Sequence, residues 1–206
     1  MVNTFLAHDL LWGMTPEQLP ADAPMWAIEA QRLGQPVVVR RALCTPGQVA
    51  VGVRGPLREQ RFATVMSLDS IERRVKPEEL CHVGLDRDLP ALRALAQLRA
   101  MLDASGWAWG VSGSAGFELA SGVEALHERS DLDLILRTPQ PLSRELAREL
   151  VKIFDTAACQ VDMQLQTPHG AIALREWAGA SQRVLLKNAR EACLVINPWN
   201  PQEQAA

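Results

Sequence analysis

Two runs of small and apolar residues in the middle of the chain are the most informative part of its sequence. The first is Gly110-Val-Ser-Gly-Ser-Ala-Gly-Phe-Glu-Leu119, and the second, after a polar interval, is Ser130-Asp-Leu-Asp-Leu-Ile-Leu136. The pattern predicts a strand, a tight glycine turn, a short helix, a loop and a second strand. Small residues at Gly113 and Ser114 stand where the first strand gives way to the helix. They let backbone N–H groups approach a phosphate, and a helix N-terminus favours negative charge. We therefore expect a phosphate-binding turn at this point.

Two carboxylates open the second strand. Asp131 and Asp133 flank Leu132 at the start of an apolar run. Residues two apart on a strand point to the same face and lie about 7 Å apart along the chain. Such a pair can hold hard cations such as Mg2+, which also bridge substrate phosphates, and can span the gap of about 3.5–4 Å in a two-metal site. A solvent-facing pair of acids is the alternative, but the glycine turn upstream favours a metal site.

A third carboxylate is predicted further along the chain. Residues 160–166 read Gln-Val-Asp-Met-Gln-Leu-Gln, a period of two that is typical of a half-buried strand. Asp162 lies on the polar face of this strand. It is the candidate third acid, and the alternative is a polar position on an edge strand.

These motifs resemble the DNA polymerase β-like nucleotidyltransferase superfamily, in which Gly-Ser is followed by Asp-x-Asp and a later strand acid. More narrowly, residues 113–119 and 130–134, with an early His8-Asp9-Leu10, look like the phosphoribosyl-dephospho-CoA transferase family of the malonate decarboxylase system (holo-acyl-carrier-protein synthase, MdcG). The interval 114–131 is longer than is usual in the superfamily and agrees with the narrower family.

The resemblance implies a reaction. A serine hydroxyl on the acyl-carrier-protein subunit of malonate decarboxylase attacks the α-phosphorus of 2′-(5″-triphosphoribosyl)-3′-dephospho-CoA, and pyrophosphate leaves. Asp131, Asp133 and Asp162 would then be the catalytic and metal-binding residues, with Mg2+ as the cofactor and Mn2+ as an alternative. Asp162 would also orient or deprotonate the serine.

The same resemblance implies residues that bind the substrate. Gly113 and Ser114 would hold the β- and γ-phosphates through backbone N–H groups and a hydroxyl. Residues 183–190 resemble a late segment of the family that carries a lysine, so Lys187 is a candidate phosphate clamp and Arg183 a weaker one. A lysine is a good point charge for a transferring phosphoryl group.

The pattern of short strands and helices predicts an α+β fold: a smaller β-rich N-terminal domain (residues 1–80) and a nucleotidyltransferase catalytic domain (residues 81–206), a mixed sheet with flanking helices. We expect His8–Trp12 to form a helix or turn, residues 77–88 a linker, and residues 171–178 a short helix. Ser143 is expected to cap a helix. The remaining strands are expected at 35–41, 48–54 and 62–66, and helices at 23–34 and 90–106.

Basic residues gather in the N-terminal domain. They either lie on solvated strand faces or form a positive surface that grips a polyphosphate substrate or an acidic protein. These residues are Arg40, Arg41, Arg54, Arg58, Arg61, Arg73, Arg74 and Lys76.

Composition excludes several classes of protein. The chain has 206 residues, of which 48% are hydrophobic and 22% charged, so it is globular. A net charge of −3 argues against nucleic acid as a partner. No apolar run reaches the length of about 20 residues needed to span a membrane, and no signal peptide is predicted. The four cysteines are scattered, which indicates neither a zinc site nor a disulfide framework, and we expect buried, reduced thiols in a cytoplasmic protein.

Three alternatives to the narrow family stay open at this stage. Another nucleotidyltransferase of the superfamily could move an ordinary nucleotide to a small acceptor or RNA. A non-catalytic nucleotide-binding module could share the fold, although all three acids are present. A serine hydrolase using Ser114 is the distant alternative, because Ser112 stands where a nucleophile elbow requires glycine. A dinucleotide fold is excluded by the spacing of the glycines.

Overall fold

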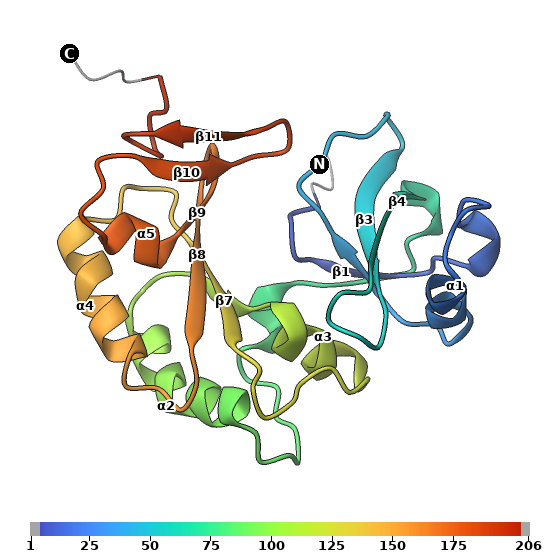
Figure 1. The fold of residues 1–206 in the computed structure, drawn as a ribbon, viewed down its shortest axis with the longest axis horizontal. Coiled ribbons are helices and arrows are strands. Elements are labelled where there is room, and N and C mark those ends of the chain that lie inside the picture. The colour runs from blue at the N-terminus through green and yellow to red at the C-terminus, as the bar shows by residue number, and fades with distance from the viewer. Residues whose placement is uncertain (1–4, 203–206) are drawn as a thin grey trace. The chain divides into compact units, whose positions relative to one another are not determined.

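The computed structural model describes residues 5–202 of the chain (Figure 1). The chain divides into two compact units. The first comprises the residues up to Lys76 together with Ala120–Val123. The second comprises Pro77–Leu119 and the chain from Glu124 onward. The fold of the chain is α+β, with a β-rich N-terminal unit, as the sequence predicts. No helix of the described residues has the length and apolar character to cross a membrane.

The first unit is built on a five-stranded antiparallel sheet in the order β4-β3-β2-β1-β5. One α-helix and two short 3-10 helices accompany this sheet. The elements are β1 (Leu10–Trp12), η1 (Pro16–Gln18), α1 (Met25–Arg32), β2 (Val37–Val39), β3 (Gln48–Arg54), β4 (Arg61–Ser67), η2 (Leu68–Ser70) and β5 (Arg73–Val75).

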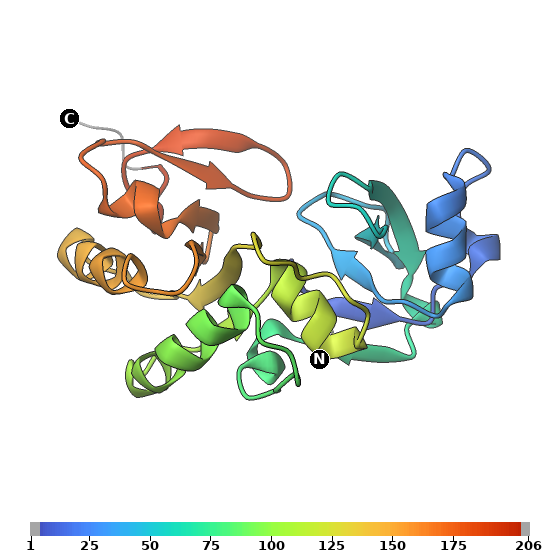
Figure 2. The same cartoon turned by 60° about the horizontal axis from the view of Figure 1, so that its bottom comes forward.

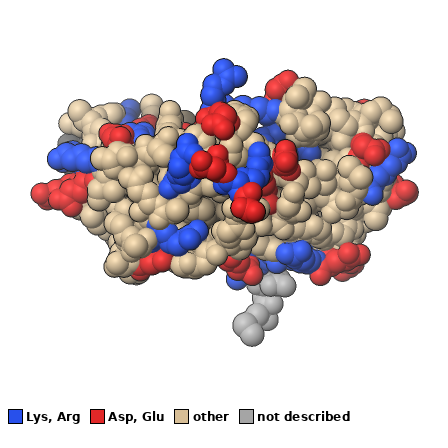
Figure 3. Space-filling view, turned by 90° about the horizontal axis from the view of Figure 1, so that it is seen from below, with Lys and Arg blue, Asp and Glu red and all other residues tan. Residues whose placement is uncertain are grey.

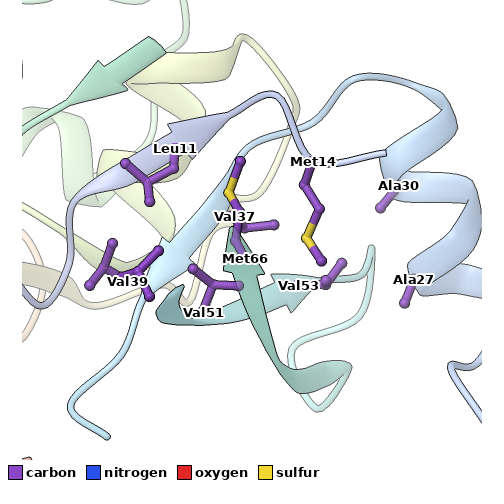
Figure 4. Packing of buried hydrophobic residues seen from close by; sticks show 10 residues of the cluster. Leu11, Met14, Ala27, Ala30, Val37, Val39, Val51, Val53 and Met66 are labelled. Carbon is purple, nitrogen blue, oxygen red and sulfur yellow. The ribbon is translucent and has the colours of Figure 1, made fainter. Parts of the chain in front are cut away.

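Alternating β-branched residues make the core of the first unit (Figure 4). Every second residue of these strands points to the same face, so the apolar face is continuous across the sheet. Its buried members include Leu11, Val37, Val39, Val51, Val53 and Met66, and α1 contributes Ala27 and Ala30.

The predicted helix or turn at His8–Trp12 is confirmed only at His8, which lies in a turn. Leu10–Trp12 instead form a strand between β2 and β5. Leu11 does pack in the core, as expected. Asp9, just before the strand, is completely buried and forms an ion pair with Arg74 of β5, with 2.5 Å between Oδ2 and Nη2. A buried charge needs such a partner.

The second unit is built on a six-stranded mixed sheet in the order β11-β10-β9-β8-β7-β6. Only β7 and β8 run parallel, and the other neighbouring strands are antiparallel. The elements are η3 (Pro77–Leu80), α2 (Pro90–Ala104), β6 (Trp109–Val111), α3 (Gly113–Ser121), β7 (Leu132–Arg137), α4 (Arg144–Phe154), β8 (Val161–Thr167), β9 (Gly170–Ala173), α5 (Leu174–Ala178), β10 (Val184–Lys187) and β11 (Ala192–Val195).

The parallel pair β7–β8 is joined by the crossover helix α4, which lies beside α2 (Figures 1 and 2). The Ser143 Oγ accepts the backbone N–H of Leu146 at 3.1 Å, so the predicted helix cap is confirmed. On β7, Leu132, Leu134 and Leu136 are buried on one face. The opposite face of β7 is therefore the one that carries its polar residues.

Other expectations for this unit need correction. Residues 171–178 are half strand and half helix, because β9 ends at Ala173 and α5 begins at Leu174. The expected linker begins with the 3-10 helix η3, which packs on β6 and whose Glu78 accepts a hydrogen bond from Arg137 at 2.6 Å.

The cysteines of both units are free thiols, but the expectation that all four are buried is wrong. Only Cys81 is buried, and Cys44 is exposed.

Candidate active site

Two of the predicted acids lie side by side on neighbouring inner strands of the second sheet. Asp133 on β7 is the register partner of Asp162 on the parallel strand β8. Neighbouring strands are about 4.8 Å apart, and directly opposed residues point to the same face. Both residues are half-buried, between buried apolar residues that face the other way. The alternation seen in the sequence therefore places these two carboxylates together on one face.

Asp131 lies just before β7 and is also half-buried. Burial raises the pKa of the Cys159 thiol, and the negative charges of Asp131 and Asp162 add to the rise. The Gln160 side chain donates to Asp162 Oδ1 at 3.0 Å and to Oδ2 at 3.1 Å, which orients that carboxylate.

The glycine turn lies directly against Asp133. Gly113 has a φ of +62°, and a Cβ atom built on it would lie 1.8 Å from Asp133 Oδ2. Only glycine satisfies both conditions, because it has no side chain and adopts this backbone freely. The backbone N–H of Ser112 donates to the carbonyl of Asp133 at 2.9 Å, which ties the two segments together. The predicted turn and the second acid are thus neighbours.

Ser114 follows as the second residue of α3 and is half-buried. The helix sits close to β6, because a Cβ atom at Gly116 would lie 2.6 Å from the carbonyl oxygen of Val111. The second glycine of the motif thus permits close packing of helix on strand. The first turn of α3 begins against the Asp133 carboxylate. The N–H groups at the start of a helix carry a partial positive charge that favours an anion.

Lys187 is on the same sheet face as the acids but not beside them. It is the register partner of Ala171, which pairs with Gln166, which pairs with Arg137. Arg137 is four residues from Asp133, or about 13 Å along the strand, and Lys187 is three strands away, or about 14 Å. The exposed Lys187 can therefore contact only a substrate that extends well away from the carboxylates.

Arg183 is exposed and precedes β10 by one residue. Its backbone N–H donates to the Ser181 Oγ at 3.3 Å. The structure pairs Asp133 with Asp162 beside the glycine turn, and Asp131 is two residues before Asp133. Lys187 and Arg183 belong to the β10 end of the sheet, three strands away from β7.

The donor set suits a hard cation. Among the described residues, no group of three or more His, Cys, Asp or Glu side chains is close enough to hold a metal ion by itself. Mg2+ usually keeps several waters and binds through one or two carboxylates together with substrate phosphates. The oxygen ligands of Asp131, Asp133 and Asp162, beside a turn that can receive phosphate, fit that kind of site.

Sequence reasoning missed Glu118, which is 1% exposed inside α3. Its carboxylate accepts hydrogen bonds from the backbone N–H groups of Ala125 and Leu126 and from Arg87. A signal was present in the sequence, because Glu118 interrupts an otherwise apolar run of a short helix. A charged residue in such a run is seldom buried without partners.

His127 is exposed in the loop before β7. Its backbone N–H donates to the Ser130 Oγ, and the Ser130 N–H donates to the His127 carbonyl, both at 3.0 Å. Residues 127–130 therefore form a tight turn that leads into Asp131.

Several of the basic residues in the first unit have identified contacts. Arg74 pairs with Asp9, the Arg73 guanidinium lies 4.4 Å from the centre of the Trp12 ring, and Arg41 contacts His8. On the face seen in Figure 3, basic and acidic side chains are interspersed. A role for these arginines in gripping a polyphosphate or an acidic protein stays a prediction.

The second unit has a nucleotidyltransferase-like core, and the first is a β-rich N-terminal unit. Residues 79–198 match the model of the phosphoribosyl-dephospho-CoA transferase MdcG C-terminal domain, and residues 6–77 match that of the N-terminal domain. The chain belongs to this phosphoribosyl-dephospho-CoA transferase (MdcG) family.

Curated relatives agree along the whole chain. A phosphoribosyl-dephospho-CoA transferase of Pseudomonas fluorescens strain Pf0-1 is 71% identical over 206 residues, covering 100% of both chains. The protein of the same name from Pseudomonas aeruginosa PAO1 is 54% identical over 97% of this chain and 96% of its own. That from Azotobacter vinelandii is 53% identical over 93% of each chain. No solved structure matches the chain significantly.

Proposed function

We propose that this protein transfers the phosphoribosyl-dephospho-CoA group from 2′-(5″-triphosphoribosyl)-3′-dephospho-CoA to a serine of the malonate decarboxylase acyl carrier protein, with release of pyrophosphate. The observation that carries the proposal is the pairing of Asp133 with Asp162 beside the Gly113 turn. Full-length similarity to proteins named phosphoribosyl-dephospho-CoA transferase supports the donor.

The proposed chemistry needs positioning and neutralisation of charge more than covalent catalysis. Asp131 and Asp133, with Asp162, would hold Mg2+, or Mn2+, which supplies the positive charge that a triphosphate requires. Ser114 and the N–H groups at the start of α3 would bind the β- and γ-phosphates. The departing pyrophosphate is the part of the donor that these groups would stabilise.

Asp162 would orient the acceptor serine or take its proton. It faces the same side as Asp133 on the neighbouring strand, and Gln160 fixes its orientation. As the oxygen–phosphorus bond to the serine forms, the bond to pyrophosphate breaks and the serine proton is passed to the carboxylate. A base must lie within hydrogen-bond reach of that proton.

Lys187 and Arg183 are proposed to contact the donor far from the reacting phosphorus. Lys187 shares the sheet face of the acids, and a donor that combines a triphosphate, a ribose and dephospho-CoA is long enough to reach along such a face. An ordinary nucleotide would not need contacts at this distance.

Intact-mass spectrometry of purified apo carrier protein tests the proposal. After incubation with this enzyme and Mg2+, the donor triphosphoribosyl-dephospho-CoA should add the mass of the phosphoribosyl-dephospho-CoA group. ATP, GTP, CTP and UTP should add nothing, and omission of the metal should abolish the gain. Nucleotide transfer from ATP to a small acceptor, with no gain from the proposed donor, would instead indicate another nucleotidyltransferase.

A further inference from the structure

Glu118 is the most completely buried carboxylate of the second unit for which the structure gives contacts. Its Oε2 accepts the backbone N–H groups of Ala125 and Leu126, each at 2.7 Å, and its Oε1 accepts from the Arg87 guanidinium. Burial raises the pKa of Glu118, but these three donors more than offset it, so the pKa lies below the ordinary carboxyl value. The side chain is therefore a charged group with its hydrogen bonds satisfied.

The segment that Glu118 holds leads directly to a proposed metal ligand. Leu126 is 5% exposed, and the turn formed by His127 and Ser130 follows it. Asp131 is the next residue. Because the chain is fixed by hydrogen bonds at Leu126 and again at Ser130, little of the loop is free to move before Asp131.

The other end of the same helix contacts the other ligand. The first residue of α3, Gly113, lies against the carboxylate of Asp133. Glu118 is five positions after Gly113, which is about 7.5 Å along the helix axis. A single rigid helix thus touches Asp133 at its start and, through Glu118, holds the loop that ends in Asp131.

We propose that Glu118 is a positioning residue that fixes the place of Asp131 relative to Asp133 for binding a divalent cation. This inference rests on the proposed function only in taking these two acids as metal ligands. Residues behind metal ligands set their geometry, and their loss commonly weakens metal affinity 10-fold or more.

The geometry requires a carboxylate at this position. A glutamine has one acceptor oxygen and one donor NH2 group. If its oxygen accepted from Ala125 and Leu126, its NH2 group would face Arg87, and in the other orientation it would face the two backbone N–H groups. Glu118→Gln therefore preserves the size of the side chain but breaks one side of the arrangement.

Direct Mn2+ binding, measured by the loss of the free-ion signal in electron paramagnetic resonance, tests the inference without donor or carrier protein. Glu118→Gln should weaken Mn2+ binding by about 10-fold relative to the unaltered protein. The matched control is Glu128→Gln, the same chemical change at an exposed position of the same loop, which should bind Mn2+ as the unaltered protein does. The Mg2+ concentration for half-maximal transfer should shift in parallel.

Unchanged Mn2+ affinity in folded Glu118→Gln would overturn the inference, as would equal weakening in Glu128→Gln. If Glu118→Gln does not fold, Arg87→Ala decides, since it removes only the Oε1 partner. Weaker Mn2+ binding in that variant supports the inference and wild-type binding overturns it. If Glu118→Gln weakens Mn2+ binding while the unaltered enzyme does not modify the carrier protein, only the proposed donor or acceptor is wrong.

Discussion

At the scale of single residues, the candidate site depends on a contact between Gly113 and the Asp133 carboxylate that leaves no space for a larger side chain at position 113. The carboxylate of Asp133 occupies the space that a side chain at position 113 would need. A glycine and an acid that are 20 residues apart in the sequence are therefore in contact. The sequence indicates why glycine suits a phosphate-binding turn. It does not reveal that this glycine also makes room for the Asp133 carboxylate, because that depends on the pairing of β6 with β7.

Gly113→Ala should therefore reduce transfer strongly. A left-handed backbone costs a non-glycine residue about 1–2 kcal/mol, and here the new Cβ atom would also displace the Asp133 carboxylate. Gly122→Ala is a matched control, since Gly122 has a φ of +72° and no atom lies within 4 Å of the Cβ position. We expect similar small losses in melting temperature from the backbone and a loss of Mn2+ binding only in Gly113→Ala. Equal Mn2+ affinity in the two variants would contradict the contact.

Asp162→Asn separates chemistry from binding. An amide keeps the size of the side chain but cannot take a proton, so kcat for transfer should fall by about 100-fold or more while KM for the donor changes little. Steady-state kinetics with the carrier protein held at saturation measures both constants. A rise in KM with kcat preserved would show that Asp162 serves only to bind the donor.

At the scale of elements, α3 has a contact near each end, and only the one at its start could be predicted from the sequence. The glycines at its start are recognisable because turns and close packing need them. The role of Glu118 near its end was not recognised, because burial and partners such as Ala125 and Arg87 follow from how the next loop folds back. The three-residue strand β5 and the four-residue strand β9 were missed for a different reason: runs this short show too little alternation to predict a strand.

The lowered pKa of Glu118 predicts how stability depends on pH. A carboxyl group whose pKa is lower in the folded than in the unfolded protein stabilises the fold above its ordinary pKa, and the stabilisation is lost as the pH falls through the folded value. The ordinary value is 4.5. Melting temperature should therefore fall as the pH is lowered below about 4.5, and more steeply in the unaltered protein than in Glu118→Gln. Parallel curves for the two proteins between pH 7 and pH 3 would contradict this role for the charge.

At the scale of the whole molecule, the positions of most strands in the sequence could be predicted, but which strands pair with one another could not. Period-two alternation located β3 and β8 closely, and it put Asp162 on the polar face of β8. The strand predicted at residues 62–66 corresponds to β4. The register that makes Asp162 the partner of Asp133, and the distance from them to Lys187, depend on strand order. Nothing in the local sequence encodes that order, so the distance between Lys187 and the two acids could not be predicted.

The core of the first unit gives a prediction for stability. Leu11 is completely buried among valines from neighbouring strands (Figure 4). Leu11→Ala should lower the free energy of unfolding by about 2–5 kcal/mol, because the cavity is only partly refilled. Met66→Leu, a volume-conserving change in the same core, should cost less than about 1.5 kcal/mol. Urea denaturation followed by circular dichroism measures both, and equal effects would show that Leu11 is not in a close-packed core.

The proposed function depends above all on Asp133 holding the metal at the reacting triphosphate. The single-turnover rate of carrier-protein modification by Asp133→Asn at saturating Mg2+, followed by intact mass, tests this role. We expect a folded variant with an unchanged melting temperature and a rate at least about 100-fold lower, because a metal ion contributes several kcal/mol of charge stabilisation. A folded Asp133→Asn that modifies the carrier protein at the unaltered rate would show that Asp133 does not hold the metal.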